Sequence, residues 1–316
     1  MFFSYLKRNV IHSIHDPFWF VSTLSSRGYL KWMDDEKYLS LLYRLRFHRK
    51  LDLNKPITFN EKLQWLKIHN RKAEYSKMVD KYAVKEYVAS LIGEKYIIPT
   101  LGRWDSFDDI DFEQLPNQFV LKCNHDSGGL VIVKDKSRFD RVEAKKLFDR
   151  SLKRNYYWEA REWPYKNVKP CIFAEKYMED LETKELRDYK IFTFNGVAKA
   201  LFIATDRQKE GEDVKFDFFD ADFKHLPFKQ GHENADVLPK KPETFEQMIH
   251  LAETLSKGIP HVRVDFYEVN GMTYFGELTF SHFGGLMPFF PDDWDRRFGE
   301  LLILPDQYGG GVRDNR

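Results

Sequence analysis

The sequence predicts an α+β protein in which helical segments alternate with antiparallel sheets. Residues 1–75 repeat apolar side chains at the three- and four-residue spacing of helices. From residue 96 onward, short apolar runs come in pairs around glycine turns, and Asn195-Gly196 within 188–206 is the clearest of these turns. Hairpins join antiparallel strands, so the order helix, sheet, helix, sheet is typical of α+β architecture.

The chain is long enough to bury a large core and to form an enzyme, since it has 316 residues. Hydrophobic residues make up 42% and charged residues 31%, which is typical of a soluble globular protein. Lys and Arg total 50 and Asp and Glu total 49, giving a net charge of +1. Because no overall positive field exists, we expect no nucleic-acid partner.

Cysteine usage and hydropathy predict a cytoplasmic protein. Cys123 and Cys171 are the only cysteines, too few for a disulfide framework and without metal-site spacing. No apolar run reaches the roughly 20 residues of a membrane-spanning helix. No signal peptide with a small-residue cleavage site is apparent.

The stretch 1–20 is amphipathic if it forms a helix. Lys7 and Arg8 are among its polar positions, and its apolar face consists of Phe3, Leu6, Val10 and Ile14. Such a face either packs on the protein itself, which is the commoner arrangement, or rests on the inner face of the membrane.

The other elements follow from local patterns in chain order. Asn54-Lys55-Pro56 separates two helical stretches. Asp80 is the expected N-cap of a helix that Gly93 closes, so Lys81 lies in its first turn. We expect helices at 36–48, 60–69 and 139–154 and one from the capping box Thr244/Gln247 to Gly258, strands at 96–99, 119–122, 130–133 and 172–178, and hairpins at 188–206 and 261–280.

The run FVLKCNHDSGGLVIVK, residues 119–134, is the first candidate binding motif. It consists of a strand ending on Lys122, a polar glycine loop and a second strand. A lysine ammonium neutralises polyphosphate, and exposed backbone N–H groups cradle it. An ordinary hairpin, in which Gly128 and Gly129 satisfy turn geometry, fits the same pattern.

Asp265 and Glu277 form a candidate Mg²⁺ site, because carboxylates are hard oxygen donors. Their pairing depends on the turn at Asn270-Gly271. A two-residue turn pairs Val269 with Met272 and sends Glu277 to the other face of the hairpin from Asp265, which removes the site.

A three-residue loop with a glycine bulge would instead pair Glu268 with Met272 and set Arg263 opposite Glu277. Asp265 would be the diagonal neighbour of Glu277, and Thr279 would share the face. We favour this register, because it leaves the alternating apolar residues on the opposite, core face. A solvated face with an Arg263–Glu277 salt bridge is the non-functional alternative.

Four ordered motifs resemble the ATP-grasp superfamily. They are Asp80-Lys81, Lys122 with the loop to Gly129, Glu175-Lys176-Tyr177-Met178, and the hairpin of Arg263, Asp265 and Glu277. The runs LNKPITFNEKLQWLK, DKYAVKEYV, LRDYKIFTFNG and VRVDFYEVNGMTYFGELTF are similar to its teichuronopeptide-biosynthesis (TupA-like) branch, over about residues 50–304.

The resemblance implies an ATP-grasp fold in which two α+β subdomains enclose ATP. Together with the helical pattern of the first residues and the glycine-rich end GGGVRDNR, it predicts a helical region at 1–78, the ATP-grasp domain at 79–308 and a flexible tail at 309–316. The subdomains would be 79–178, which binds ATP, and 179–308, which carries the metal site.

The resemblance also implies a role for each matching residue. Lys81 and Lys122 would contact ATP phosphates, and Ser127, Gly128 and Gly129 would close over them. Glu175 would accept from the adenine amino group, the backbone of Lys176 and Met178 would line the hinge, and Asp188 or Glu182 would bind ribose. Asp265 and Glu277 would hold Mg²⁺, while Arg263 would stabilise the acyl phosphate. Thr279 stands where the superfamily has a metal-binding asparagine.

The implied reaction activates a carboxylate as an acyl phosphate, releases ADP and lets an amine attack to form an amide. The branch implies that a uronic-acid sugar and an amino acid or amine are the substrates, in surface-polysaccharide biosynthesis. Peripheral contact with membrane-bound polysaccharide machinery fits that role. The alternatives are a sugar phosphotransferase using the same site and a non-catalytic nucleotide-binding subunit of an assembly complex.

Some further residues fit two interpretations. Cys123 is a buried thiol rather than a nucleophile, since no partner histidine is specified. His125 either touches ligand or is an exposed loop residue. Ser281–Gly285 either binds the acceptor or is a plain turn, and Arg207 with Lys209 either closes on the γ-phosphate or lies in a solvated loop. The sequence contains no zinc spacing, Gly-x-Ser-x-Gly elbow or Walker A motif.

Overall fold

The computed structural model describes residues 16–181, 186–205 and 213–305. The chain folds as two compact units. Unit 1 comprises 1–51, 67–90 and 97–179, and unit 2 comprises 52–66, 91–96 and 180–316. Helices α4 (Phe59–His69) and α6 (Val84–Ile92) have residues in both units. The sequence-based boundaries at 78, 178 and 308 stay predictions.

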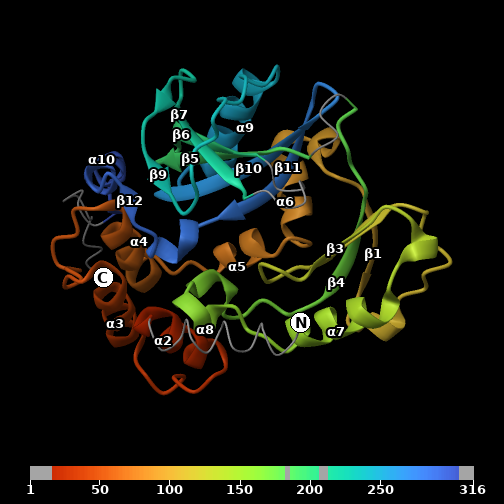
Figure 1. The fold of residues 1–316 in the computed structure, drawn as a ribbon, viewed down its shortest axis with the longest axis horizontal. Coiled ribbons are helices and arrows are strands. Elements are labelled where there is room, and N and C mark those ends of the chain that lie inside the picture. The colour runs from red at the N-terminus through yellow and green to blue at the C-terminus, as the bar shows by residue number, and fades with distance from the viewer. Residues whose placement is uncertain (1–15, 182–185, 206–212, 306–316) are drawn as a thin grey trace, which may run out of the picture. The chain divides into compact units, whose positions relative to one another are not determined.

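Unit 1 contains a four-stranded antiparallel sheet in the order β1-β4-β2-β3 (Figure 1). Phenylalanines dominate its core, in which Phe119 of the sheet and Phe148 of α7 are both fully buried. The elements of this unit are α2 (Pro17–Ser26), α3 (Asp35–Phe47), α5 (Glu74–Val79), β1 (Thr100–Trp104), η2 (Phe107–Asp109), β2 (Phe119–Cys123), β3 (Leu130–Val133), η3 (Lys136–Arg138), α7 (Arg141–Leu152), α8 (Tyr157–Ala160), η4 (Trp163–Tyr165) and β4 (Ile172–Lys176).

The N-terminal helices of unit 1 are held by a buried arginine. Arg161 is fully buried, and its guanidinium donates to Leu30 O at 2.8 Å and to Ser25 Oγ at 3.0 Å. Its Nε lies 3.1 Å from a carboxylate oxygen of Asp35. These contacts tie α2 and α3 to α8, since a buried guanidinium requires acceptors on all sides.

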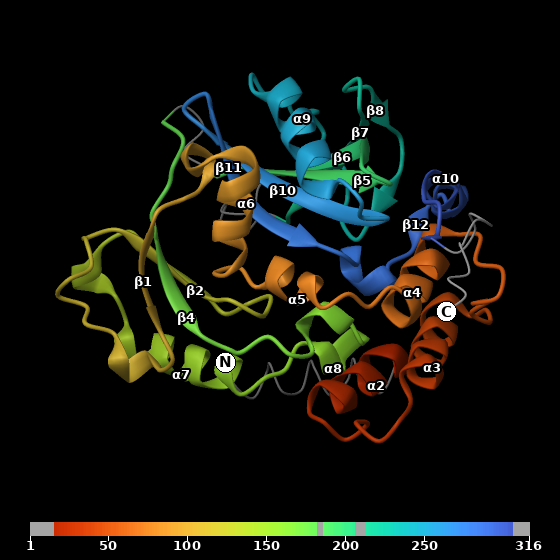
Figure 2. The same cartoon turned by 180° about the vertical axis from the view of Figure 1, so that it is seen from behind.

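Unit 2 contains a six-stranded antiparallel sheet in the order β11-β10-β5-β6-β7-β8 (Figure 2). Its core is aromatic, and Phe59 of α4 packs edge-on against Phe192 and Phe298. The elements of this unit are η1 (Glu94–Tyr96), β5 (Asp188–Phe194), β6 (Val197–Thr205), β7 (Lys215–Asp220), β8 (His225–Leu226), β9 (Lys229–Gln230), α9 (Phe245–Ser256), β10 (His261–Val269), β11 (Met272–Thr279), η5 (His282–Gly285), β12 (Phe289–Phe290) and α10 (Asp293–Leu301).

The predicted α+β class is confirmed, as are the hairpins β2–β3, β5–β6 and β10–β11. The turn of β5–β6 is Asn195-Gly196, whose φ angles of 52° and 83° are both positive. Helices α3, α4 and α7 match their predicted ranges within a few residues. Within the described residues, no helix is both long enough and apolar enough to span a bilayer.

Three local expectations are wrong. The strand predicted at 96–99 does not form, since Tyr96 ends the 3₁₀-helix η1 and β1 begins at Thr100. The helix expected from residue 81 begins at Val84, and the Asp80 carboxylate caps the turn before it by accepting from Tyr82 N and Ala83 N. The capping box at Thr244 does not form, since the Thr244 amide and hydroxyl both donate to Glu268.

Candidate active site

The first polar cluster, in unit 1, surrounds a buried carboxylate. Glu175 on β4 is 6% exposed, and its two oxygens lie 2.5 Å from Lys122 Nζ and 2.5 Å from Lys85 Nζ. Val120 pairs with Glu175 in the sheet, so Lys122, two residues further along β2, is its diagonal neighbour on the same face. Lys85 reaches the same carboxylate from α6.

Burial and charge act in opposite directions in this cluster. Burial opposes ionisation of Glu175, but the ammonium groups of Lys122 and Lys85 outweigh it and hold the pKa of Glu175 below its usual value. For Lys85, burial is the larger effect and lowers the pKa despite the attraction of Glu175. The cluster therefore gathers two ammonium groups around one carboxylate.

Lys85 and Lys122 differ in how firmly they are held. Lys85 Nζ also donates to Ile98 O and Thr100 Oγ1, both at 2.9 Å, so its three donors are used. Among the described residues, Lys122 has Glu175 as its one ion-pair partner, and its side chain is 21% exposed. Lys122 is therefore the better placed of the two to bind an added anion.

The glycine loop after β2 has a rigid, buried base. Asn124 accepts from Cys171 N at 2.8 Å and donates to Asp80 at 2.8 Å. His125 is 2% exposed, and its Nε2 lies 3.0 Å from Ser151 O, which fixes the proton on Nε2 because a carbonyl only accepts. The expectation that His125 is an exposed loop residue is therefore wrong, since its ring is buried and bonded to the protein, and contact with a ligand stays a prediction.

The tip of this loop presents two exposed residues, Ser127 and Gly128. Gly128 has φ +128°, a conformation that favours glycine. A Cβ at Gly129 would lie 2.8 Å from Cys123 Cβ, so that position requires glycine for space. The side chain of Lys81 contacts the loop, since its Nζ donates to Asp126 O at 2.7 Å. The loop thus has a fixed base and an open tip.

The predicted adenine-binding hinge lies at the end of β4. Lys176 N donates to Pro99 O at 3.0 Å, and the side chain of Lys176 is exposed. Met178, two residues beyond β4, is half-buried. Since the Glu175 carboxylate already accepts from two lysines, its role as an acceptor for adenine stays a prediction. The sequence did not lead us to expect that Lys85 and Lys122 contact Glu175.

The second polar cluster, in unit 2, lies on β10 and β11. Val269 pairs with Met272, and the turn residues Asn270 and Gly271 both have positive φ, 51° and 71°. The favoured three-residue loop, with Glu268 opposite Met272 and Arg263 opposite Glu277, is therefore wrong. The two-residue turn forms instead.

A two-residue turn alone would put Asp265 and Glu277 on opposite faces of the hairpin, but a β-bulge brings them opposite each other. The register shifts between Asp265 and Phe266, where Gly276 is the extra residue of β11, so that Asp265 pairs with Glu277 and Arg263 with Thr279. A Cβ on Gly276 would lie 3.0 Å from Asp265 O, which explains the glycine. The two carboxylates consequently share one face, as the metal hypothesis requires.

Arg263 connects the members of this cluster, and it is 7% exposed. Its Nε and Nη2 each donate to Asp265, both at 2.7 Å, in a two-pronged ion pair. Nη2 also lies 3.2 Å from Glu277 Oε1 and 3.0 Å from Thr279 Oγ1. The guanidinium therefore fixes all three predicted metal ligands.

Lys190 on β5 joins the cluster from the neighbouring strand. It pairs with Asp265 in the sheet, and its Nζ contacts Asp265 Oδ2 and lies 3.2 Å from Asp188 Oδ1. Asp188 is 1% exposed. The structure thus places Asp188 beside the predicted metal pair; its contact with ribose stays a prediction, and Glu182, Arg207 and Lys209 lie outside the described residues.

His282 is a buried hydrogen-bond partner of the Arg263 guanidinium. Its Nδ1 accepts from Arg263 Nη1 at 2.7 Å, and the side chain is 2% exposed. Burial first, and then the charge of Arg263, hold the pKa of His282 well below its usual value, so the ring is neutral. Gln64 fixes the following turn by donating to Gly285 O at 2.6 Å. The Ser281–Gly285 segment therefore contains a buried support for Arg263.

The oxygen donors of the carboxylate cluster are of the type that Mg²⁺ takes, and the metal assignment stays a prediction; Asp265 is 1% exposed and accepts from Arg263 and Lys190. Asp265, Glu277 and the Thr279 hydroxyl offer hard oxygen donors on one face, and Glu277 is the accessible member, with a side chain 30% exposed. The described residues contain no group of three or more His, Cys, Asp or Glu arranged to hold a metal. The remaining positions would go to water and phosphate oxygens, as Mg²⁺ commonly has.

Three residues of these clusters were missed by sequence reasoning: Lys85, Lys190 and His282. Two of them left a signal. Lys85 follows Lys81 by four residues, one helical turn, and Lys190 alternates with Asp188 along a strand, which puts both side chains on one face. His282 was noted only within a glycine-rich segment, and its burial depends on long-range packing.

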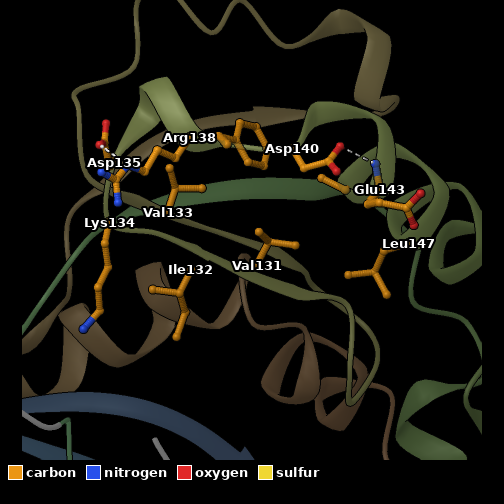
Figure 3. A pocket seen from close by; sticks show the side chains of 11 residues that line it. Val131, Ile132, Val133, Lys134, Asp135, Arg138, Asp140, Glu143 and Leu147 are labelled. Carbon is orange, nitrogen blue, oxygen red and sulfur yellow. Dashed lines mark hydrogen bonds and ion pairs between the residues drawn. The ribbon is translucent and has the colours of Figure 1, made fainter. Parts of the chain in front are cut away.

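A cavity of about 530 Å³ lies elsewhere in unit 1, between β3 and α7 (Figure 3). The residues that line it include Val131, Val133, Lys134, Glu143 and Leu147. None of the predicted site residues contributes to this cavity. The candidate residues thus form two polar clusters, one within unit 1 and one within unit 2.

Comparison with known proteins places the chain in a family. The sequence model of the TupA-like ATP-grasp family matches residues 61–303. A search of the curated proteins gave no match. Similar solved structures include D-alanine–D-alanine ligase from Bacillus anthracis with ATP, at 16% identity and TM-score 0.38 over 64% of this chain and 54% of that one.

Two further structures are an L-amino acid ligase from Bacillus licheniformis and the ATP-grasp ligase PsnB with minimal precursor, Mg and ADP. The first is 11% identical with TM-score 0.47 over 89% of this chain and 66% of that one. The second is 11% identical with TM-score 0.38 over 71% and 58%. Each alignment covers less than two thirds of the neighbour's length. The family assignment rests on the sequence match, which spans most of the chain, and by that match the chain belongs to the TupA-like ATP-grasp family.

Proposed function

We propose that this protein is an ATP- and Mg²⁺-dependent ligase that joins a carboxylate to an amine through an acyl phosphate. The observation that carries the proposal is the pairing of Asp265 with Glu277 across the Gly276 bulge, with Arg263 bound to both. That arrangement places two carboxylates, the proposed metal ligands, beside a fixed cation, and phosphoryl transfer to a carboxylate needs both.

The nucleotide would take its phosphate contacts from unit 1. Lys122 would bind phosphate oxygens, helped by Lys81 and the exposed tip Ser127-Gly128, while Gly129 lets the loop fold closely. Lys85 would act indirectly, by holding Glu175 and so positioning Lys122. Lys176 and Met178 would line the adenine side, with Glu175 as the proposed acceptor for the adenine amino group.

The carboxylates of unit 2 would hold the metal. Asp265 and Glu277 would coordinate Mg²⁺, with Thr279 as a weaker ligand. When bound, the ion neutralises charge on the β- and γ-phosphates. Arg263 would stabilise the acyl phosphate and the oxyanion formed during attack. Asp188 would either bind ribose, as the family resemblance implies, or extend the acidic face through Lys190.

The reaction balances without a protein nucleophile. An oxygen of the substrate carboxylate attacks the γ-phosphorus, the bond to the β-phosphate oxygen breaks, and ADP leaves. The amine then attacks the acyl carbon, phosphate leaves with the bonding electron pair, and the amine loses a proton to give the amide. Positioning and charge neutralisation supply the catalysis.

We further propose that the carboxylate belongs to a uronic-acid sugar and that the amine is an amino acid or similar amine, in surface-polysaccharide biosynthesis in the cytoplasm. The match to the TupA-like ATP-grasp family supports this choice, because the sequence motifs resemble the branch of that superfamily concerned with teichuronopeptide biosynthesis. The acceptor would be either a free sugar nucleotide or a lipid-linked glycan.

Product analysis tests the proposal. Protein, Mg-ATP, a uronic-acid sugar nucleotide and amino acids should give ADP, phosphate and an amide detected by mass spectrometry. AMP and pyrophosphate would refute the acyl-phosphate route, and phosphate retained on the sugar would show a phosphotransferase. ATP turnover unchanged in Glu277→Gln would refute the metal assignment. Nucleotide binding without any ATP turnover in the wild-type protein would favour a non-catalytic nucleotide-binding subunit.

A further inference from the structure

The two lysine contacts of Glu175 are made on different carboxylate oxygens. Lys85 Nζ lies 2.5 Å from Oε1 of Glu175, and Lys122 Nζ lies 2.5 Å from Oε2. All three residues belong to unit 1. Each oxygen therefore has its own lysine, so that one contact can change while the other stays.

Lys85 is fixed at its oxygen by neighbours on the same sheet. Thr100 pairs directly with Glu175 across β1 and β4, so their side chains lie on one face. Lys85 Nζ donates to Thr100 Oγ1 and to Ile98 O, both at 2.9 Å, and it lies 5.4 Å from the centre of the Phe173 ring. An ammonium group has three N–H donors, and these two acceptors with Glu175 use all of them. Lys85 therefore has no donor left for a ligand.

Lys122 is held less firmly than Lys85. Its neighbours across the sheet, Phe173 on β4 and Leu130 on β3, have apolar side chains. Among the residues that the structure describes, Glu175 is the one partner of the Lys122 ammonium group. The Lys122 side chain is 21% exposed, against 12% for Lys85. The ammonium group of Lys122 can therefore contact an anion from solvent without giving up other protein partners.

The burial of Glu175 makes the second lysine necessary. Glu175 is 6% exposed, and a carboxylate removed from water needs a counter-ion. If Lys122 were its single counter-ion, a phosphate that attracted Lys122 would leave Glu175 buried and unpaired. Lys85 removes this conflict, because it stays at Glu175 while Lys122 contacts the phosphate.

We propose that Lys85 is a positioning residue for nucleotide binding: it is the permanent counter-ion of Glu175 and so leaves the charge of Lys122 available to a nucleotide phosphate. This role rests on the proposed function, in which Lys122 binds phosphate. Lys85 then determines phosphate affinity without a ligand contact of its own. Its effect on that affinity must depend on the negative charge of Glu175.

Calorimetric titration of the whole chain with the ATP analogue AMP-PNP and Mg²⁺ tests this role. Lys85→Met removes the ammonium group but keeps an apolar chain beside Phe173, and it should weaken binding about tenfold or more. Lys85→Gln, which keeps an N–H donor without the charge, should show a similar loss. Adding Glu175→Gln to Lys85→Met should recover most of the lost affinity, since an uncharged amide needs no counter-ion.

A matched control separates this role from a general loss of charge or of fold. Lys77 also forms an ion pair in unit 1, with its Nζ 3.1 Å from Glu86, but both side chains are exposed. Lys77→Met should therefore bind AMP-PNP as the wild type does. Urea unfolding of every variant gives the folded fraction in the titration buffer. A purely structural role would weaken binding only as far as that fraction falls, whereas the proposed role weakens binding by fully folded protein.

Two results would overturn the role of Lys85. The first is wild-type affinity in folded Lys85→Met. The second is a double variant, Lys85→Met with Glu175→Gln, that binds no more tightly than Lys85→Met alone. If Lys122→Ala still weakens binding in the same titrations, the proposed phosphate site stands although the role of Lys85 fails. Absence of AMP-PNP binding by the wild type would overturn the proposed nucleotide site and the role of Lys85 with it.

Discussion

The two polar clusters are opposites in charge. In unit 1, Lys85 and Lys122 surround the single carboxylate Glu175, and two cations against one anion leave an excess of one positive charge. In unit 2, three carboxylates meet two cations, which leaves an excess of one negative charge; the members are Asp188, Asp265 and Glu277 with Arg263 and Lys190.

The proposed function assigns phosphate binding to the cluster of unit 1 and metal binding to the cluster of unit 2, and the opposite charges of the two clusters suit these two roles. A cluster with excess ammonium attracts phosphate, and a cluster with excess carboxylate attracts a divalent cation. Each cluster also carries internal counter-ions, which keep its buried charges paired before ligand binds. If this interpretation is right, substitutions in the two clusters should have different effects on nucleotide affinity and on metal dependence.

The largest effect is expected from Arg263→Lys. Lysine keeps the charge but cannot make the two-pronged contact with Asp265 or reach Glu277, Thr279 and His282 together. We expect turnover to fall by roughly 10²–10³-fold, as for loss of an oxyanion-stabilising donor. ADP release measures this. Arg297→Lys, at an exposed ion pair with Asp293, is the control and should retain activity.

Lys122→Ala should mainly affect nucleotide affinity. A charge-assisted hydrogen bond contributes about 1.5–3 kcal/mol, which corresponds to roughly 10–100-fold weaker binding. The fold should survive, because Lys85 still pairs with Glu175. Calorimetric titration with a nucleotide measures the effect, and Lys145→Ala on α7 is the control. Affinity equal to that of the wild type would contradict the phosphate role of Lys122.

Gly276→Ala tests whether the bulge holds the carboxylate cluster together. The added Cβ would approach Asp265 O to 3.0 Å, so the strands must separate slightly or shift. We expect about 1–3 kcal/mol of destabilisation and weaker Mg²⁺ activation of turnover. Urea unfolding and a Mg²⁺ titration measure the two effects. Met272→Ala, exposed on the same hairpin, should change neither.

The same hairpin shows what sequence reasoning could and could not reach. Asn270-Gly271 correctly indicated a tight turn, and the polar alternation correctly put Asp265 and Glu277 on one face. The position of the bulge was wrong, because polar alternation fixes the face but not where an extra residue enters. Gly276 was a usable signal, since an isolated glycine within a strand suggests a bulge.

Lys190 and Lys85 illustrate a second limit of prediction from sequence, which concerns contacts between different elements. The side-chain alternation along β5 is a property of the strand itself, so Lys190 was predictable beside Asp188. The contact of Lys85 with Glu175 joins residues 90 positions apart through the packing of α6 near the sheet, which no local pattern encodes. Strands and turns could be predicted from the sequence, but counter-ions from other elements could not.

Substitutions at His282 should have a smaller effect than those at Arg263. Asparagine can offer an oxygen to Arg263 Nη1 in place of His282 Nδ1, whereas phenylalanine cannot. We therefore expect His282→Asn to retain more turnover than His282→Phe at similar stability. Turnover and urea unfolding, measured together, separate positioning of Arg263 from packing. Equal turnover in both variants would indicate that His282 is a packing residue.

The smallest effect is the acid sensitivity of the unit 1 cluster. The folded-state pKa of Glu175 lies below its ordinary value of 4.5, since two ammonium groups favour the carboxylate. A depressed carboxyl pKa stabilises the fold above the unfolded-state value and loses that contribution as pH falls through the folded-state value. Unfolding free energy should therefore decrease as pH falls below about 4.5.

Glu175→Gln should lower the unfolding free energy at neutral pH and flatten its dependence on pH. Glu113→Gln, at an exposed ion pair, should leave the slope unchanged. An identical slope in Glu175→Gln would mean that other carboxylates determine the acid response, and the charge contrast between the two clusters would then rest on the carboxylates of unit 2 alone.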